Sequence, residues 1–188
     1  MLPPSEIFHW MYATAFLMVG LCLLAQAIVG DEVWNRRFSR RYLWPGFGFL
    51  MGVLLWPAMV YPRTGSMILM LTHTAWAQMM MIAGGAQLGL ASGKLRSRYW
   101  RLTMPLAFVV SGATFLSHEQ HGWLYGRAPL IHHVCGWTLI VGAIFPLAQI
   151  FRPRSLLLGT AFALTLVVVS IALFSSRDGA PIFSQLVF

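Results

Sequence analysis

The sequence predicts an all-α, polytopic membrane protein in which residues 1–188 form a single integral membrane domain, a bundle of six transmembrane helices. Three observations predict this class. Of the 188 residues, 58% are hydrophobic and only 10% are charged, whereas charged residues make up about 25% of an average soluble domain. The chain contains six long apolar stretches, and its basic residues gather in every second connection between them. Each spanning helix needs about 20 apolar residues, so the chain has room for six.

The six stretches are separated by short segments rich in Arg, Gly, Pro and Ser. The first stretch is preceded by Glu6 and by no basic residue, which favours a retained span over a cleaved signal peptide. The segments 62–66 and 152–155 separate the second stretch from the third and the fifth from the sixth. The fourth and sixth stretches are near the shortest length that crosses about 30 Å of hydrocarbon. The expected spans are 7–29, 42–61, 67–90, 102–117, 130–151 and 156–174.

The net charge of +8 comes from 13 Lys and Arg against 5 Asp and Glu, and its placement predicts topology. The second and fourth connections and the C-terminal tail contain only Arg63, Arg127 and Arg177. Ten basic residues lie in the first, third and fifth connections: Arg36, Arg37, Arg40, Arg41, Lys94, Arg96, Arg98, Arg101, Arg152 and Arg154. This bias predicts that these three connections are cytoplasmic and that both termini lie outside. We therefore expect a multi-pass protein of a bacterial-type inner membrane whose charge contacts lipid, with no nucleic-acid partner.

No Asp, Glu, Lys or Arg lies inside the six expected spans. Proton relays, ion pumps and voltage sensors need such groups where the charge crosses, so this sequence does not favour a transmembrane ion path. The six histidines are the more informative polar residues, because on this topology all of them fall at the outer ends of spans or in the adjoining loops. They are His9, His73, His118, His121, His132 and His133.

His118 and His121 are three residues apart, which on a continuing helix places both imidazoles on one face. Such a pair can hold one metal ion, and Glu119 could add a carboxylate ligand or orient a neighbouring ring. The motif differs from the His-Glu-x-x-His of zinc proteases, whose histidines are four residues apart. A solvated loop would also explain this pair.

His132 and His133 point about 100° apart on a helix, so one of them is expected to face the bundle interior and to act as a ligand. The sequence leaves open which one it is. Cys135 lies three residues after His132, roughly on the same face. It is a weaker ligand candidate, because a small buried thiol more often serves packing.

His73 lies about two turns inside the third expected span, where an imidazole is costly unless it binds a neighbour, a metal or a cofactor. Met70 lies one turn before it, and thioether with imidazole suits Cu(I). Arg127 could bind an anionic group such as a haem propionate. A pairing of His73 with Glu119, and a purely packing role for Met70, remain open.

Several of these residues resemble a known pattern. The stretch reads Phe115-Leu116-Ser117-His118-Glu119-Gln120-His121-Gly122, then Arg127-Ala128-Pro129-Leu130, then His132-His133, with His73 at the start of an earlier span. From residue 73 to about 151 this order resembles the dermal-papilla-type family of polytopic transmembrane proteins, grouped by a domain of unknown function. In that family the two histidines before the Gly are two residues apart, and here they are three apart. The resemblance implies that the histidines act together, and it implies no reaction.

The leading hypothesis is a protein that binds a transition metal, copper or zinc, near the periplasmic surface through His73, His118, His121 and one of His132 and His133. It would serve metal handling or metalloenzyme assembly with a periplasmic metal or electron-transfer partner. Three alternatives remain open. The first is a b-type cytochrome with one haem between two histidines, and the second is a zinc-dependent membrane lipid hydrolase with Glu119 as general base. The third is a structural accessory subunit whose histidines only form hydrogen bonds.

Overall fold

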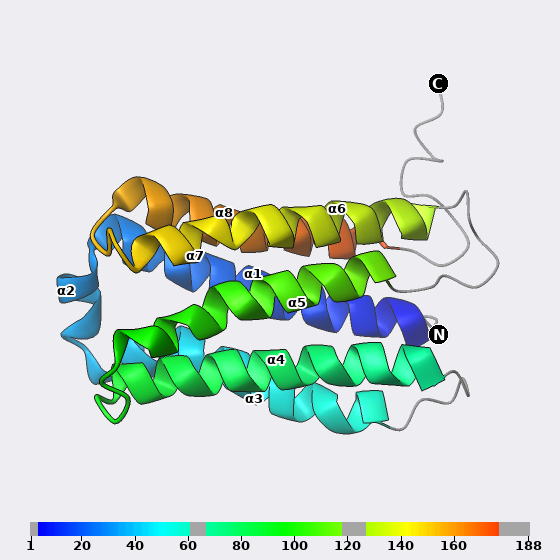
Figure 1. Ribbon diagram of the computed structural model, residues 1–188, viewed down its shortest axis with the longest axis horizontal. Coiled ribbons are helices and arrows are strands. Elements are labelled where there is room, and N and C mark those ends of the chain that lie inside the picture. Colours follow the sequence, from blue (N-terminus) through cyan, green and yellow to red (C-terminus); the bar gives the residue numbers. More distant parts are fainter. Residues whose placement is uncertain (1–3, 61–66, 118–126, 177–188) are drawn as a thin grey trace.

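The computed structural model describes residues 4–60, 67–117 and 127–176, and within these ranges it describes all side chains except those of residues 4–8, 57–60, 67–70, 73 and 127–129. This part of the chain is helical and contains no strand, which confirms the all-α prediction (Figure 1). The helices are α1 (Pro4–Val29), α2 (Asp31–Asn35), α3 (Phe38–Val60), α4 (Met67–Ala91), a 3-10 helix η1 (Arg98–Leu102), α5 (Thr103–Ser117), α6 (Arg127–Gly142), α7 (Ile144–Gln149) and α8 (Leu156–Phe174).

The helix ends have recognisable causes in the sequence. Gly30 adopts a φ of 89° between α1 and α2, a conformation that costs glycine little. Ser155 caps α8, because its Oγ accepts a hydrogen bond from the N–H of Leu158 at 3.4 Å. Pro146 has no N–H to donate to the carbonyl of Gly142, so the helical pattern breaks between α6 and α7. The expected fifth span is therefore one helix with an interruption.

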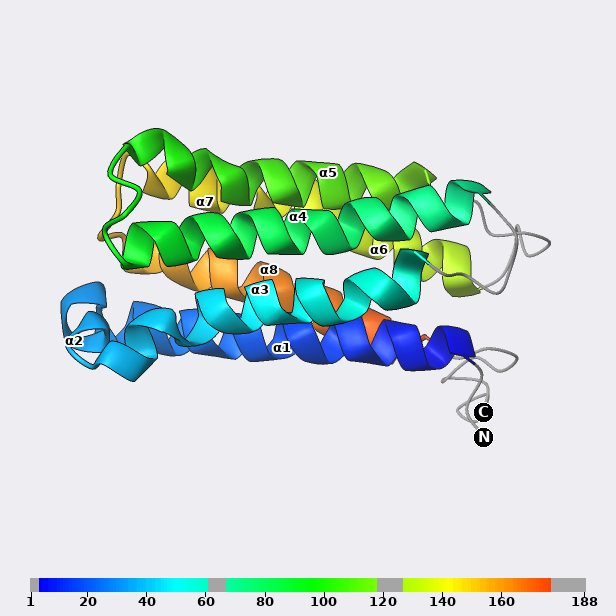
Figure 2. The same ribbon diagram turned by 90° about the horizontal axis from the view of Figure 1, so that it is seen from below.

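The long helices form a ring. α1 lies between α3 and α8, α4 lies between α3 and α5, and α6 with α7 lies between α5 and α8. The helices run side by side along one direction, as two perpendicular views show (Figures 1 and 2). Side chains from opposite sides of the ring meet inside it: the rings of Tyr12 in α1 and Trp76 in α4 lie with centroids 4.4 Å apart.

Small residues set the closest approaches between neighbouring helices. A Cβ at Gly84 of α4 would lie 2.5 Å from the backbone nitrogen of Phe49 in α3. A Cβ at Gly112 of α5 would lie 2.6 Å from the carbonyl oxygen of Gly136 in α6. Such contacts between backbones are typical of helices packed in membranes, where close van der Waals packing drives association. The helix pairs α3–α4 and α5–α6 are thus held without room for a side chain at these glycines.

Three helices in the described part of the chain are long and apolar enough to cross a membrane: His9–Val29, Leu130–Gln149 and Leu156–Phe174. The prediction of six such spans is corrected to three on this criterion. α5 has 15 residues, which is only about 22 Å of helix. The first turn of α3 contains Arg40 and Arg41 and its second contains Pro45, and α4 carries His73, Gln78 and Gln87. These residues lower the apolar character of helices that the sequence analysis counted as spans.

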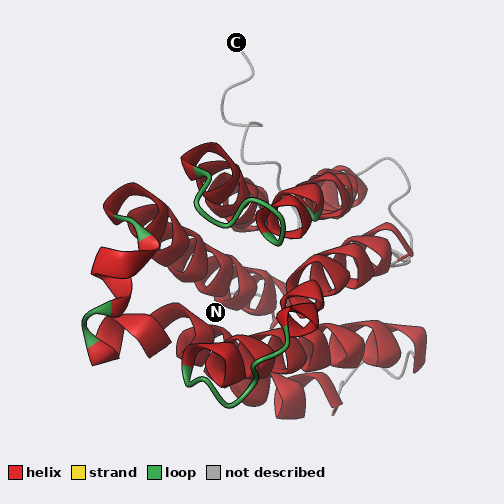
Figure 3. Cartoon of the chain, turned by 60° about the vertical axis from the view of Figure 1, so that its left-hand side comes forward, coloured by secondary structure: helices red, strands yellow, loops and turns green. Residues whose placement is uncertain are grey.

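The basic connections gather at one end of the bundle, which we call the basic end. It comprises α2, the segment between α4 and α5 with η1, and the segment between α7 and α8, and these segments lie together at the left of Figure 1 and come forward in Figure 3. Here Gln26 of α1 accepts a hydrogen bond from Trp44 Nε1 of α3 and donates one to Asp31 of α2, each at 2.8 Å. Arg154 pairs with Glu32 at 3.2 Å on the exposed surface.

Candidate functional site

The end of the bundle opposite the basic end brings histidines from distant parts of the chain together, and we call it the histidine end. α1 and α4 begin there, α5 ends there and α6 begins there (Figure 1). The rings of His9 in α1 and His132 in α6 lie with centroids 5.7 Å apart and planes tilted by 57°. His132 is 4% exposed and His9 is partly buried. Two imidazoles therefore meet at the edge of an otherwise apolar interior.

Ser176, which follows α8, holds the first of these rings. Its Oγ lies 3.2 Å from Nδ1 of His9, and its carbonyl oxygen accepts a hydrogen bond from Trp10 Nε1 at 3.4 Å. A hydrogen bond at one ring nitrogen fixes the orientation of an imidazole, and it directs the other nitrogen toward a ligand in many metal sites. The site is thus built by α1, α6 and the end of α8.

An aromatic layer lies one turn deeper and connects the histidines to the core. His132 packs against Phe115 of α5 at a centroid distance of 5.4 Å, and Phe115 meets Trp76 of α4 edge to face at 4.1 Å. Trp76 in turn contacts Tyr12, three residues after His9 in α1. Edge-to-face and offset pairs of this kind stabilise by about 0.5–1.5 kcal/mol each beyond the area they bury. This layer fixes the histidine-bearing helices α1 and α6 relative to α4 and α5.

Three buried polar atoms near this layer have no hydrogen-bond partner in the described structure: Tyr12 Oη, Thr74 Oγ1 and Trp76 Nε1. Tyr12 is 1% exposed and Trp76 is 5% exposed. A buried donor without a partner costs about 1–3 kcal/mol, so these groups call for an explanation. The fourth such atom in the described part, Trp34 Nε1, belongs to α2 at the basic end.

The structure distinguishes the two adjacent histidines that the sequence left equivalent. His132 is buried and faces the interior, whereas His133 is exposed. Cys135, one turn after His132, is fully buried, and its Sγ lies 3.9 Å from the carbonyl oxygen of Val169 in α8. The thiol therefore packs against α8.

The other candidate residues lie wholly or partly outside the described structure. His118, His121 and Glu119 fall outside the described residues, directly after the end of α5. His73 and Met70 lie on the first turns of α4, and Arg127 is the first residue of α6, but their side chains are outside the described set. Position 73 precedes Trp76 by three residues and the buried Ala77 by four, so it shares their face of α4.

Within the described residues, no three His, Cys, Asp or Glu side chains come together in an arrangement that could hold a metal ion. The described part of the site is a pair, His9 with His132. His9 is the residue that the sequence analysis did not include among the ligands. A signal was present, since His9 opens the first span at the same end as the other histidines, but no motif links it to His132.

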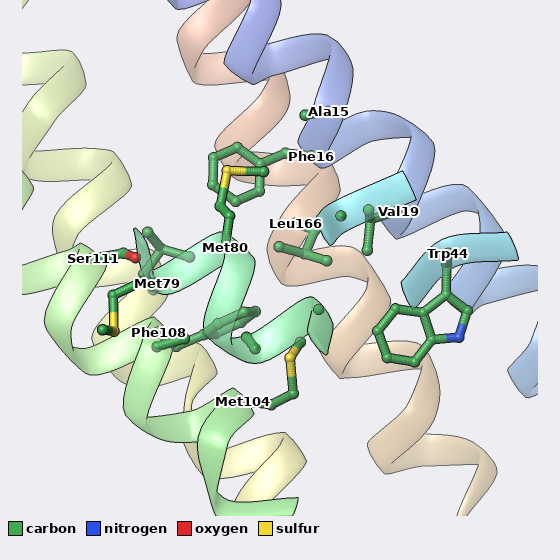
Figure 4. Close-up of a pocket in the computed structure, with 15 residues that line it drawn as sticks. Ala15, Phe16, Val19, Trp44, Met79, Met80, Met104, Phe108, Ser111 and Leu166 are labelled. Atoms are coloured by element: carbon green, nitrogen blue, oxygen red, sulfur yellow. The ribbon is translucent and has the colours of Figure 1, made fainter. Parts of the chain in front are cut away.

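A small apolar pocket lies deeper in the ring, toward the middle of the bundle. It has a volume of about 70 Å³, and Ser111 and Trp44 are the described lining residues whose side chains carry a polar group (Figure 4). Met79, Met80 and Met104 line it together with Phe16 and other apolar residues. The labelled methionine sulfurs point in different directions in the close-up and do not converge on one point. Its mainly apolar lining is typical of a small gap in the packing between helices, and it does not resemble a metal site.

The chain was compared with protein-family models, with curated proteins and with solved structures. The resemblance to the dermal-papilla-type family stays a prediction from the sequence. None of the three comparisons found a match for this chain.

Proposed function

We propose that this protein binds a transition metal ion, copper or zinc, at the histidine end of a membrane-embedded helical bundle. The observation that carries the proposal is the contact between His9 and His132. Neutral imidazole is a preferred ligand of both metals. The fold places two imidazole rings from residues far apart in the sequence next to each other at one end of an apolar bundle.

The ring geometry fits a single bare ion. With metal–nitrogen bonds of about 2.0–2.1 Å, two imidazoles on one tetrahedral ion have ring centroids about 5–6 Å apart. The observed distance is 5.7 Å. Two axial ligands of one haem must instead oppose each other across a flat macrocycle, which sets their ring centroids more than about 6 Å apart, whereas the observed distance is shorter and Phe115 packs beside His132. The geometry thus favours a bare ion over a haem between these two rings.

Two imidazoles do not complete a coordination shell, since zinc sites generally have four ligands. His118 and His121 follow the end of α5 after Phe115, which contacts His132. His73 precedes Trp76 by one turn. We propose that the shell is completed from these three histidines. Glu119, Met70 and Cys135 are weaker candidates, and the contact of Cys135 with α8 argues against its use.

We further propose that the whole ring lies in a bacterial-type inner membrane. α3, α4 and α5 run alongside the three candidate spans at the same depth (Figures 1 and 2), so burying the spans in lipid also places these helices in it. The concentration of Arg and Lys at the basic end favours its location in the cytoplasm. The histidine end would then face the periplasm, where it could exchange metal with a soluble partner protein.

The test compares two adjacent histidines. The protein is purified in mild detergent, and bound copper, zinc and iron are quantified together with the absorption spectrum. We expect His132→Ala and His9→Ala to remove most of the bound metal, and the matched control His133→Ala, at the exposed neighbour, to retain it. Equal metal content in wild type and His132→Ala would contradict the proposal and favour a structural role for the pair. A Soret band with stoichiometric iron would establish a cytochrome instead.

A further inference from the structure

We infer that the metal site is open, with one coordination position for a small exchangeable ligand that the Tyr12 hydroxyl and the Trp76 indole N–H bind by hydrogen bonds. The inference rests on the proposed metal site and adds to it a class of ligand: water, hydroxide or another small anion or oxygen donor. An open position distinguishes a site that can react or exchange from a closed structural one.

The first step is the location of the two donors. Tyr12 lies one turn after His9 in α1, and Trp76 contacts both Tyr12 and Phe115, the ring that packs against His132. Five rings thus follow one another in contact, from His9 through His132, Phe115 and Trp76 to Tyr12, which lies three residues after His9 in α1. The consecutive centroid distances, beginning at His9 and ending at Tyr12, are 5.7, 5.4, 4.1 and 4.4 Å.

The second step is the direction in which the side chains of Tyr12 and Trp76 extend along their helices. Long side chains in α-helices lean toward the N-terminus of their own helix. α1 and α4 both begin at the histidine end (Figure 1), so this tendency directs the side chains of Tyr12 and Trp76 toward the histidines. The donors are therefore associated with the histidine pair.

The third step is the kind of ligand that these two hydrogen-bond donors can bind. Tyr12 Oη and Trp76 Nε1 are buried and have no partner in the described structure, and both can donate a hydrogen bond. Thr74 Oγ1, two residues before Trp76, is a third such group. Buried donors next to a cation match an oxygen or anion that the cation itself binds, because hydrogen bonds to charged acceptors are the stronger ones. A metal-bound small ligand would satisfy donors that are otherwise costly to bury.

Azide is the probe, because it is a small anion that replaces water on Cu(II) and produces a new absorption band. Purified full-length protein is loaded with Cu(II) and titrated with azide. We expect a saturable band in the wild type and an affinity for azide about ten-fold or more lower in Tyr12→Phe, which removes one hydrogen bond to a charged acceptor and keeps the ring. The control Tyr99→Phe alters an exposed tyrosine at the basic end and should leave the affinity unchanged.

The outcomes separate the two proposals. If the protein binds no copper, the metal site and the open position fail together. If copper binds and no azide band forms, or if Tyr12→Phe binds azide as the wild type does, the open position with its donors is wrong and the metal site stands. If Tyr12→Phe no longer holds copper, Trp76→Phe decides by the same titration, and an unchanged azide affinity in that variant overturns the inference.

Discussion

At the scale of single residues, one serine lies within hydrogen-bond distance of a histidine of the proposed site. Ser176 Oγ lies 3.2 Å from Nδ1 of His9, whereas the neighbouring Ser175 donates its hydroxyl to the carbonyl of Ala172 within its own helix end, at 2.6 Å. The two serines are adjacent in sequence, but the hydroxyl of one contacts His9 and the hydroxyl of the other contacts a backbone carbonyl. They offer a matched pair for testing whether orientation of His9 matters.

We expect Ser176→Ala to weaken metal binding about 10- to 100-fold, because groups that orient a ligating histidine contribute to affinity on this scale. Ser175→Ala should leave the affinity unchanged. The measurement is competition of the purified variants against a chromophoric chelator of known affinity. Equal affinities in both variants would mean that Ser176 does not position a ligand.

At the scale of elements, the close contact of α3 with α4 has no space for added atoms. A Cβ at Gly84 would lie 2.5 Å from the nitrogen and 2.8 Å from the Cα of Phe49, both of them backbone atoms that cannot rotate away. A Cβ at Gly46 of α3 would meet nothing closer than Leu88 Cδ2 at 3.9 Å. The same substitution therefore has opposite consequences at two positions in one helix pair.

We expect Gly84→Ala to destabilise the protein by about 1–3 kcal/mol, the usual cost of overpacking. Gly46→Ala should be neutral or stabilise by up to about 1 kcal/mol, since alanine is the better helix former. Thermal unfolding in detergent, followed by circular dichroism, measures both. A Gly84→Ala protein as stable as the wild type would show that α3 and α4 separate without cost.

At the scale of the whole molecule, the two ends of the bundle differ in their side chains. One end carries Arg and Lys in three connections and the other carries the histidine pair. α1 and α8 meet along their length, and the chain enters α1 and leaves α8 at the histidine end (Figure 1). Because the positive-inside rule orients short basic loops, both termini should lie outside the cytoplasm.

Fusions of a phosphatase that is active only in the periplasm test this topology. A fusion after Phe188 should be active, and a fusion after Lys94, in the connection between α4 and α5, should be inactive. Activity after Lys94 would reverse the orientation and would move the histidine end to the cytoplasmic side. Inactivity at both positions would place them on the same side of the membrane, and it would contradict the three crossings, by α5, by α6 with α7 and by α8, that this topology requires between them.

The sequence predicted the helices well and their arrangement poorly. Apolar stretches flanked by Arg, Gly and Pro placed α1, α3, α4, α5 and α8 to within a few residues, because apolar composition and helix formation are local properties. The break at Pro146 was also visible in principle. The contact of His9 with His132 was not predictable, because it depends on which helices become neighbours. His132 is buried and His133 is exposed. This difference also depends on how α6 packs against its neighbours, so the sequence alone did not reveal it.

The closure of the ring has a consequence for how the protein is made. Ser176 follows His9 by 167 residues, and α1 reaches one of its two neighbours, α8, only after all the intervening helices have been synthesised. Until then α1 has α3 on one side and lipid on the other, and its histidine lacks the serine that holds it. The site is therefore assembled late in biogenesis. A chain interrupted before α8 would lack Ser176 and the helix that packs against both α1 and α6, so the arrangement around His9 and His132 depends on the completion of synthesis.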